Sequence, residues 1–452
     1  MMPRLLLLLL FTLAGCAPGQ WSDVPERRAP NIVMPEMKSF SARRAAPANR
    51  SNAQIARDFL DLSFQMESGR PIPMLTRFRG PVKVAVKGTP PASLEKDLAE
   101  LIGRLRQEAR IDISRATQNE PAQITIETVP QRQLQRAVPQ AACFVVPNVS
   151  GWSDFKRNRN RDAADWTQLT ERTTATVIIP SDVSPQEVRD CLHEEIAQAL
   201  GPLNDLYRLP DSIFNDDNFH TVLTGFDMLI LRAYYSRELP NGTRRDEAAR
   251  VLPRLLDRLN PRGRSSAIEY VSTTPPQWNE AITRALSTRS SSTRRIAYAA
   301  KAVGIAEKLG WRDNRLAFSL FVQGRVALGV NSDTAIASFL QAGALYKALY
   351  KNSVHTAHVA TQMSAFALSS GQYETAIAIV NDALPATRAS ENAALLSTLL
   401  MIKAEALDAA NRGQEAQIVR LDSLAWGQYG FGSEQKVRAR LSEIRALAQT
   451  ST

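Results

Sequence analysis

The sequence lacks any apolar run long enough to cross a membrane as a helix. Its strongest apolar run extends only from Leu5 to Leu13, and a membrane-spanning helix needs about 20 apolar residues. We therefore expect no membrane-spanning segment.

Basic residues outnumber acidic ones, but they are not interleaved with aromatic side chains. The chain has 55 lysines and arginines against 45 acids, a net charge of +10. Nucleic-acid-binding proteins usually gather basic and aromatic residues in one patch, so we expect no nucleic-acid partner. Anionic lipid or a cell-wall polymer suits this charge better. The densest basic run, Lys156–Arg161, is most simply a solvated loop, although a contact with an anionic ligand stays open.

The N-terminus has the pattern of an export signal. Met1 to Arg4 supply a positive start, the apolar run follows, and small residues precede Cys16. The sequence Leu13-Ala14-Gly15-Cys16 resembles the bacterial lipobox. This resemblance implies that residues 1–15 are a signal peptide and that Cys16 is acylated as the new N-terminus. Ala17, in place of aspartate, then implies transfer to the outer membrane, facing the periplasm or the cell surface. A simple signal peptide with a chance cysteine is the alternative.

Cysteine is otherwise scarce, because only two remain once Cys16 is set aside. Cys143 and Cys191 are an even pair in a chain that we expect to reach a compartment where disulfides persist. We predict one bridge between them. Two free, buried thiols are the alternative, because unpaired cysteine is also a common small core residue.

Length and local patterns divide the chain into a tether and two domains. A chain of 452 residues exceeds what one core usually supports. Residues 16–52 are rich in proline and poor in apolar residues, which predicts a disordered tether. Residues 53–263 mix helix and strand patterns, and we expect strands near 82–86, 124–129 and 175–179. The predicted fold class of this first domain is α+β.

The last third, residues 294–452, follows a predicted linker over 264–293 and is helical throughout. Small residues recur about every 40 positions, at Ala335, Ala376 and Ala416. The segment Ser370–Ile377 resembles the second half of a tetratricopeptide repeat, where a turn glycine precedes a helix with small packing residues. The resemblance implies three or four stacked helical hairpins, which would dock an envelope protein or a peptide partner. An ordinary helical bundle is the alternative.

The best-defined helix of the chain follows the strand near 175–179 directly. Ser184 is placed as its N-cap, Pro185 as its first residue, and Glu187 completes a capping box. Gly201 and Pro202 should end the helix.

This helix and the turn after it carry an unusual polar cluster. Glu194 and Gln198 lie four residues apart and share a helix face, with Glu195 beside them. The segment 194–205 resembles the zinc helix and turn of metzincin peptidases, His-Glu-x-x-His-x-x-Gly-x-x-His-Asp. It keeps the glutamate, glycine and aspartate of that pattern as Glu195, Gly201 and Asp205. The three zinc-binding histidines are replaced by Glu194, Gln198 and Asn204, and Phe214 stands near the place of the family's methionine.

A second resemblance covers nearly half of the chain. Residues 53–263, and above all the segments 191–195 and 212–217, resemble the bacterial family called domain of unknown function 2927. Members of that family share the glutamate pair, the glutamine and the asparagine-aspartate turn, so the resemblance implies that these substitutions are characteristic. Together the two resemblances imply a metzincin-like domain, a mixed sheet packed on helices, whose activity is not named.

The substitutions change the chemistry that we expect of the site. Zinc prefers imidazole or thiolate ligands, whereas one carboxylate and two amides suit calcium, magnesium or manganese, if any metal binds. Without a strong Lewis acid, Glu195 has no activated water to deprotonate. We therefore expect no zinc, no firmly bound cofactor, and a cleft that binds peptide, cell-wall material or protein without cutting it. Asp216 and Asp217 are further candidates to bind a cation, although two acids in a surface loop are usually just solvated.

Three alternatives stay open for the cluster. It could be a polar network that braces the helix on its turn. It could belong to an active metal-dependent hydrolase in which Glu195 is the general base. In a third alignment, His193 and Glu194 begin a His-Glu-x-x-His motif, but its fifth position is then Ala197. We expect His193 to lie on the helix side away from the cleft.

Overall fold

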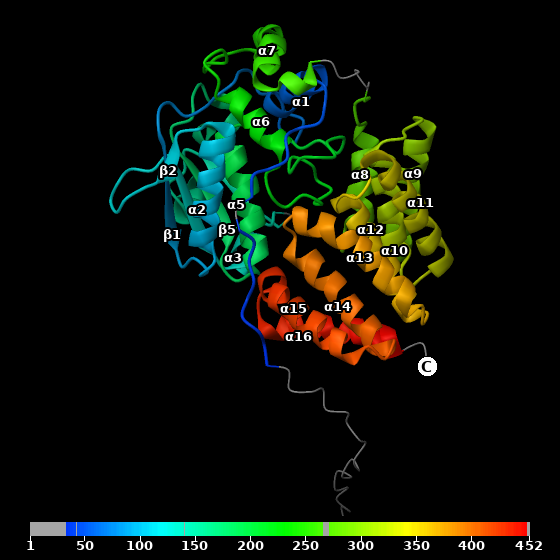
Figure 1. Cartoon of the computed structure of the whole chain (residues 1–452). Coiled ribbons are helices and arrows are strands. Elements are labelled where there is room, and N and C mark those ends of the chain that lie inside the picture. The colour runs from blue at the N-terminus through cyan, green and yellow to red at the C-terminus, as the bar shows by residue number, and fades with distance from the viewer. Residues whose placement is uncertain (1–32, 42, 140, 265–270, 450–452) are drawn as a thin grey trace, which may run out of the picture. The chain divides into compact units, whose positions relative to one another are not determined.

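The computed structural model describes residues 33–41, 43–139, 141–264 and 271–449 (Figure 1). The predicted signal peptide, the predicted lipidation site Cys16 and the first part of the predicted tether lie outside these residues. Among the helices described, none is long and apolar enough to cross a membrane.

A five-stranded mixed sheet forms the centre of the first region. Its strands are β1 Val82–Gly88, β2 Ile113–Arg115, β3 Ile124–Val129, β4 Phe144–Pro147 and β5 Ala175–Pro180. They lie in the order β2-β1-β3-β5-β4; β4 runs antiparallel to β5, and the other pairs are parallel. The three predicted strands are confirmed. The edge strands β2 and β4 have only three and four residues, too few to show an alternating pattern.

Helices cover both faces of this sheet. They are α1 Asn52–Ser63, α2 Leu94–Arg104, α3 Gln131–Ala137, α4 Trp152–Asn158, α5 Pro185–Leu200, α6 Gly225–Tyr234 and α7 Arg245–Leu259, with a π-helical turn over Leu105–Ala109. Short 3-10 turns occupy Asp162–Ala164, Trp166–Gln168 and Pro261–Gly263. Val177 and Ile179 of β5 enter a large core with α1, α2, α5, α6 and α7, whereas Ile178 enters a small core with α3 and α4. Successive side chains of a strand point to opposite faces, so β5 is buried along its whole length.

One disulfide ties the antiparallel edge strand to α5. Cys143, directly before β4, is bonded to Cys191 in the middle of α5. The predicted bridge is therefore confirmed, and the alternative of two free thiols is wrong. The bridge anchors the helix that carries the polar cluster.

The described residues of the segment 35–50, which leave out residue 42, form no helix or strand, yet they pack against folded protein. Lys38 N donates to Ala425 O at 3.1 Å, Phe40 stacks on Trp426 with ring centroids 4.5 Å apart, and Ala45 N donates to a Glu108 carboxylate oxygen at 3.1 Å. This part of the chain differs from the predicted disordered tether. The half-buried Phe40 and the buried Ala48 supply packing that the proline-rich composition does not reveal.

A run of packed helices follows, as predicted for the last third. The helices are α8 Pro276–Leu286, α9 Ser292–Lys308, α10 Asn314–Ala327, α11 Ser332–Tyr350, α12 Val354–Ser369, α13 Tyr373–Ala389, α14 Ala393–Ala409, α15 Gly413–Phe431 and α16 Glu434–Gln449. Helix α8 lies within the predicted linker and packs on α9 and α10, so the helical region begins earlier than expected. Ala335, Ala376 and Ala416 are the fourth residues of α11, α13 and α15, and each is fully buried. The recurring small residues therefore mark equivalent helix contacts.

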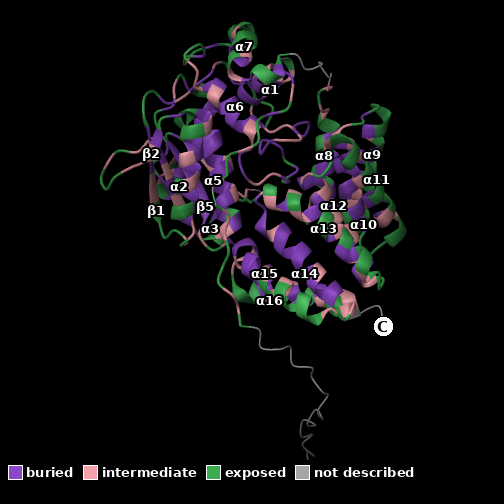
Figure 2. Ribbon diagram, viewed as in Figure 1, coloured by how far each residue is buried: buried purple, intermediate pink, exposed green. Residues whose placement is uncertain are grey.

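The helical region also contacts the first region. Helix α15 packs on α5. Aromatic residues of α8, α10 and α12 pack against Tyr207 and Phe219 in the loop that follows α5. Helices α10 and α14 are buried on most sides (Figure 2), α14 mainly by its neighbours α12, α13, α15 and α16. An isolated helical hairpin would expose one side of each helix.

Candidate functional site

The start of α5 forms as the sequence predicts. Ser184 and Glu187 make the reciprocal hydrogen bonds of a capping box, and Pro185 is the first helical residue. The end differs in detail, because Gly201 has a φ of −158° and is not in the left-handed region. A Cβ on Gly201 would lie 3.3 Å from the Tyr234 ring, so close packing rather than a special backbone angle favours glycine here.

Arg172 caps the end of α5, which the sequence did not reveal. It is buried, and its guanidinium donates to Gln198 O, Ala199 O and Gly201 O, each at 2.6 Å. These carbonyl groups have no partner within the helix. Arg172 thereby fixes the direction in which the chain leaves α5 and enters the turn that bears Asp205.

Five acidic side chains gather beside this turn. Glu194 and Glu195 come from α5, Asp205 from the turn, Asp216 from the loop after it, and Glu67 from the loop after α1. Each of Glu194, Glu195 and Asp205 has a pKa raised in part by the charge of Glu67, so the five lie within electrostatic reach of one another. Glu67 was missed because nothing in its local sequence distinguishes it from any exposed loop acid.

The cluster runs from solvent into the protein interior. Glu67 and Asp216 are exposed, Glu194 and Asp205 are partly buried, and Glu195 is only 4% exposed. Among the described residues, Oε2 of Glu195 has no hydrogen-bond partner. A buried polar atom without a partner is unusual in a native protein. We call these five residues together the acidic pocket, a name for the group of side chains and not for a cavity.

Burial and mutual repulsion hold protons in the acidic pocket. Burial, followed by the charges of Glu67 and Asp216, raises the pKa of Glu194 to about 7. Burial and then the charge of Glu194 raise the pKa of Glu195 well above its ordinary value. Burial raises the pKa of Asp205 as well, helped by a hydrogen bond with Glu67. At neutral pH the pocket therefore retains protons that solvated acids would release.

The remaining predicted site residues have other roles. Asn204 is buried and its Nδ2 donates to Asp61 O at 2.9 Å, which braces the turn against α1. Asp217 accepts hydrogen bonds from Asn215 Nδ2 and Phe219 N at 2.8 and 3.0 Å. Burial raises the pKa of Asp217 to about 8. Gln198 is buried, and its backbone oxygen bonds Arg172.

Of the predicted cluster, the structure therefore brings together Glu194, Glu195, Asp205 and Asp216. No group of three or more His, Cys, Asp or Glu side chains within the described residues is arranged to hold a metal ion.

His193 is buried, and its Nδ1 accepts a hydrogen bond from Leu223 N at 3.1 Å. Burial lowers its pKa well below the ordinary value, so this histidine is a neutral structural acceptor.

The helical region supports the loop that carries the pocket acids. The Tyr207 hydroxyl hydrogen-bonds Asp216, and the Tyr207 ring packs edge-on against Trp278 of α8, with centroids 5.1 Å apart. Asn314 Nδ2 donates to Tyr207 O at 2.5 Å. Further along the loop, Phe219 stacks on His358 of α12 at 4.4 Å. The helical region thus positions Asp216 through Tyr207, a contact that no local pattern could predict.

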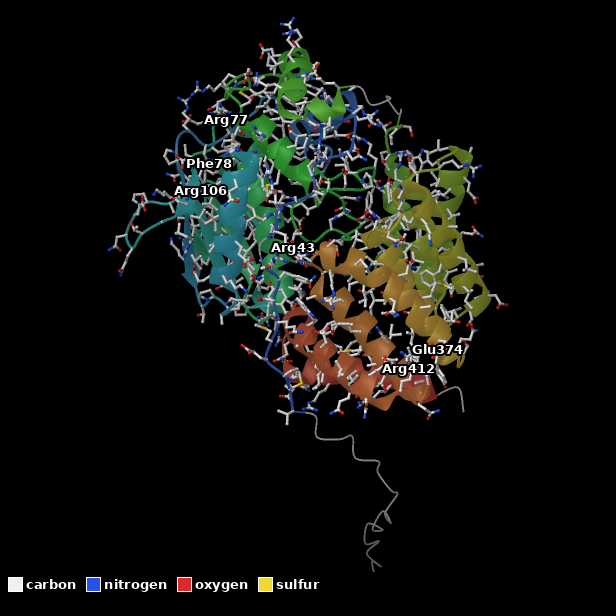
Figure 3. All side chains as sticks on the ribbon, in the orientation of Figure 1. Arg43, Arg77, Phe78, Arg106, Glu374 and Arg412 are labelled. Atoms are coloured by element: carbon white, nitrogen blue, oxygen red, sulfur yellow. A yellow bond between two sulfur atoms is a disulfide. The ribbon has the colours of Figure 1, made fainter. Side chains whose placement is uncertain are left out.

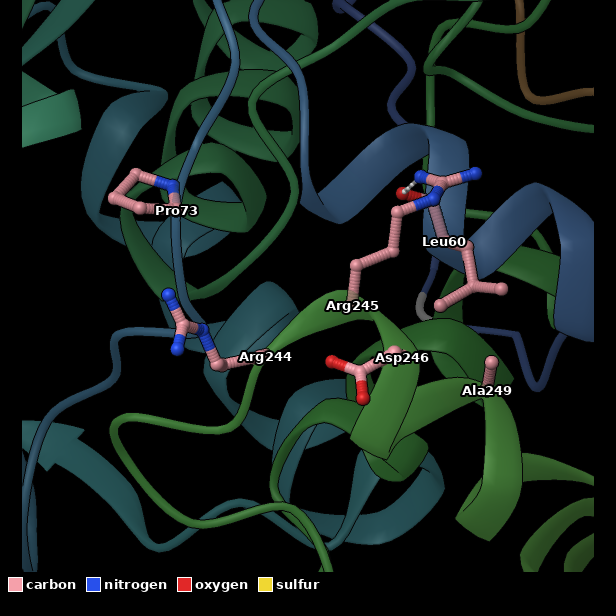
Figure 4. A pocket seen from close by; sticks show the side chains of 6 residues that line it. All are labelled: Leu60, Pro73, Arg244, Arg245, Asp246 and Ala249. Atoms are coloured by element: carbon pink, nitrogen blue, oxygen red, sulfur yellow. Dashed lines mark hydrogen bonds between the residues drawn. The ribbon is translucent and has the colours of Figure 1, made fainter.

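A cavity of about 420 Å³ lies elsewhere, at the start of α7 (Figure 4). Its lining consists of Leu60, Pro73, Arg244, Arg245, Asp246 and Ala249. Arg245 points back to Leu60, where its guanidinium donates to the backbone oxygen at 2.7 Å, and it also pairs with Asp61 at 2.6 Å. None of the five acids of the acidic pocket lines this cavity.

Comparison with known proteins identifies the first region. Residues 52–254 match the family model described as Protein of unknown function (DUF2927). The chain therefore contains a DUF2927 domain over these residues, which include all five acids of the pocket. Neither the curated proteins nor the solved structures include a match to the chain.

Proposed function

We propose that this DUF2927 domain is the ligand-binding part of an envelope lipoprotein, and that the acidic pocket holds a positively charged group of a peptide or cell-wall ligand without cutting it. In this proposal Cys16 carries the lipid, the outer membrane holds the chain on its periplasmic side, and the helical region is a tetratricopeptide-like scaffold. The kept residues Glu195, Gly201 and Asp205 support a metzincin-like origin for the domain.

The observation that carries the proposal is the gathering of five acids around an unpartnered glutamate oxygen. The chain as a whole is basic, so this concentration of acidic groups is local. An ammonium group is a compact charge with three donors. It would satisfy the Glu195 oxygen and relieve the repulsion among Glu67, Glu194 and Asp216. Lysine side chains, diamino acids of cell-wall stem peptides and free N-termini all present such a group.

Titration calorimetry with a short peptide ending in lysine tests this function. We expect binding by the wild-type protein and none by the same peptide with an acetylated lysine amine. Glu194→Gln should weaken binding about tenfold, since one partly buried charge contact is worth about 1.4 kcal/mol. The control Glu374→Gln, whose side chain is 72% exposed on α13, should bind as wild type. Equal affinity for both peptides would overturn the proposal.

The second candidate is a metal-dependent hydrolase with Glu195 as general base. A buried carboxyl group with a raised pKa is typical of catalytic acids and bases, and this observation favours the alternative. Titration with zinc, manganese and calcium, with elemental analysis, separates the two. A stoichiometric metal that is lost in Glu194→Gln, together with hydrolysis that disappears in Glu195→Gln, would establish the hydrolase instead.

A further inference from the structure

Half of the net charge of the chain resides in one short stretch. Residues 232–264 contain nine arginines and no lysine, against the four acids Glu238, Asp246, Glu247 and Asp257, a net charge of +5. The whole chain carries +10. This stretch includes the end of α6, all of α7 and the turn after it. Half of the net charge therefore lies on α7 and the segments that flank it.

Helix α7 displays these arginines along a single exposed stripe. Its apolar side, formed by Ala248, Leu252, Leu255 and Leu256, is buried, and α7 packs on α1. Arg250, Arg254 and Arg258 follow at intervals of four residues and so share the opposite face; all three are exposed. Figure 3 shows side chains that project outward from α7 at the top of the view. The stripe spans about 12 Å at 1.5 Å per residue.

More arginines adjoin this stripe from other parts of the chain. Burial, followed by the charges of Arg110, Arg258 and Arg44, lowers the pKa of Arg232 on α6. Arg44 belongs to the extended segment 35–50, and Arg110 ends the π-helical turn. Helix α6 also packs on α7 and on the π-helical turn, so four segments bring guanidinium groups together. Within the described residues no acidic side chain pairs with Arg44, Arg110, Arg232 or Arg254.

Arg250 and Arg258 pair with Asp246 and Glu238 at 2.9 and 2.6 Å. The other four arginines leave a positive surface that an external anion would neutralise. We call Arg44, Arg110, Arg232, Arg250, Arg254 and Arg258 the arginine face. Guanidinium groups bind phosphate oxygens in a bidentate way, which a lysine ammonium cannot do. None of these arginines lines the cavity at the start of α7, and three of them lie on the exposed side of that helix. The arginine face therefore suits an extended surface with many phosphates better than one small anion.

We propose that the arginine face docks on a membrane surface rich in anionic phospholipid headgroups. The apolar side of α7 is already buried in the large core, so the helix cannot insert, and the attachment is electrostatic. It should weaken steeply as salt rises, because exposed charges are screened over about 10 Å at 0.1 M salt. The lipid that we propose on Cys16 would keep the face near a membrane, but the docking itself does not depend on the acidic pocket.

Vesicle co-sedimentation tests the proposal on the chain from Ala17 to Thr452, which keeps every described residue and removes the lipid site. We expect binding to vesicles that contain phosphatidylglycerol, no binding to pure phosphatidylcholine, and release at high salt. The triple variant Arg250→Gln, Arg254→Gln and Arg258→Gln should lose on the order of 100-fold in partitioning, since each arginine near an anionic surface contributes roughly fivefold.

A matched control separates this face from the overall charge of the protein. Arg157→Gln, Arg159→Gln and Arg161→Gln remove the same charge from the densest basic run of the sequence, where all three side chains are exposed. This control should bind within about threefold of the unmodified chain. Equal losses in both triple variants, binding to pure phosphatidylcholine, or no binding to anionic vesicles at low salt would each overturn the proposal. Circular dichroism of both variants verifies that they are folded.

Discussion

Arg189 on α5 forms a buried ion pair with Glu391, in the turn between α13 and α14. Their side chains are only 4% and 6% exposed. One turn earlier on α5, Gln186 accepts hydrogen bonds from the first two backbone N–H groups of α14, at 2.6 and 3.0 Å. Beside them, Tyr429 of α15 donates to Asp97 of α2 at 2.8 Å. One polar network thus fixes the first half of α5 to the helical region.

Removing one partner of this ion pair should destabilise the protein strongly. Glu391→Gln leaves the Arg189 guanidinium buried without its counter-charge, and we expect the free energy of unfolding to fall by about 3 kcal/mol. Urea unfolding followed by circular dichroism measures it. Arg250→Gln is the control, because its pair with Asp246 is 69% and 68% exposed and should contribute under about 0.5 kcal/mol. Equal effects of the two substitutions would show that the buried pair does not hold the regions together.

Arg172→Met should loosen the end of α5. The substitution keeps an unbranched side chain but leaves the oxygens of Gln198, Ala199 and Gly201 without their donor. We expect a loss of about 3 kcal/mol in unfolding free energy and faster amide hydrogen exchange over residues 198–205. Arg79→Met, at a side chain that is 79% exposed, is the control. Unchanged exchange over 198–205 would contradict a capping role for Arg172.

The disulfide should contribute several kcal/mol to stability. Cys143 and Cys191 are 48 residues apart, and closing a loop of that length in the unfolded chain corresponds to about 4 kcal/mol in the chain-entropy model. The double variant Cys143→Ser and Cys191→Ser should therefore unfold at lower urea concentration. Reduction of the wild-type protein should have a similar effect. A wild-type protein that is insensitive to reductant would mean that the bridge closes a loop already ordered in the unfolded state.

Local features of the fold were predictable where neighbouring residues determine them. Ser184, Pro185 and Glu187 set the start of α5 through hydrogen bonds within one turn, and the alternation in β1 and β3 follows from burial of one face. The disulfide was predictable from an even cysteine count and an expected oxidising compartment. In each case the evidence lies within a few residues or in composition.

The acidic pocket was predictable only in part, because segments far from α5 in the sequence position some of its side chains. Glu194, Glu195 and Asp205 follow from the helix period and the turn. Glu67 lies in the loop after α1. Its backbone N–H donates to Leu203 O at 3.3 Å, and this contact places it beside the turn that carries Asp205. Tyr207 reaches Asp216 only because the helical region holds its ring. Such contacts depend on tertiary packing, which a single sequence does not display.

The acidic pocket should make the protein less stable as pH rises from about 4.5 to 8. In the unfolded chain Glu194 titrates near its ordinary pKa of about 4.3, whereas in the folded protein burial and then Glu67 and Asp216 raise that pKa to about 7. The folded state therefore binds more protons than the unfolded state between these values. The resulting stability is fully present below about pH 4 and is lost as pH rises through 7.

Glu194→Gln removes this titration, because glutamine is neutral at every pH. The variant should match the wild type near pH 4.5 and be more stable than it near pH 8, by on the order of 1–2 kcal/mol after allowance for partial exposure of the site. Urea unfolding across this pH range measures the difference, with Glu374→Gln as the exposed control. A wild-type protein and a Glu194→Gln variant with parallel pH profiles would show that the carboxyl groups of the pocket do not repel one another. An ammonium ligand would then have no repulsion among these acids to relieve. The grouping of the five acids would therefore not explain its binding.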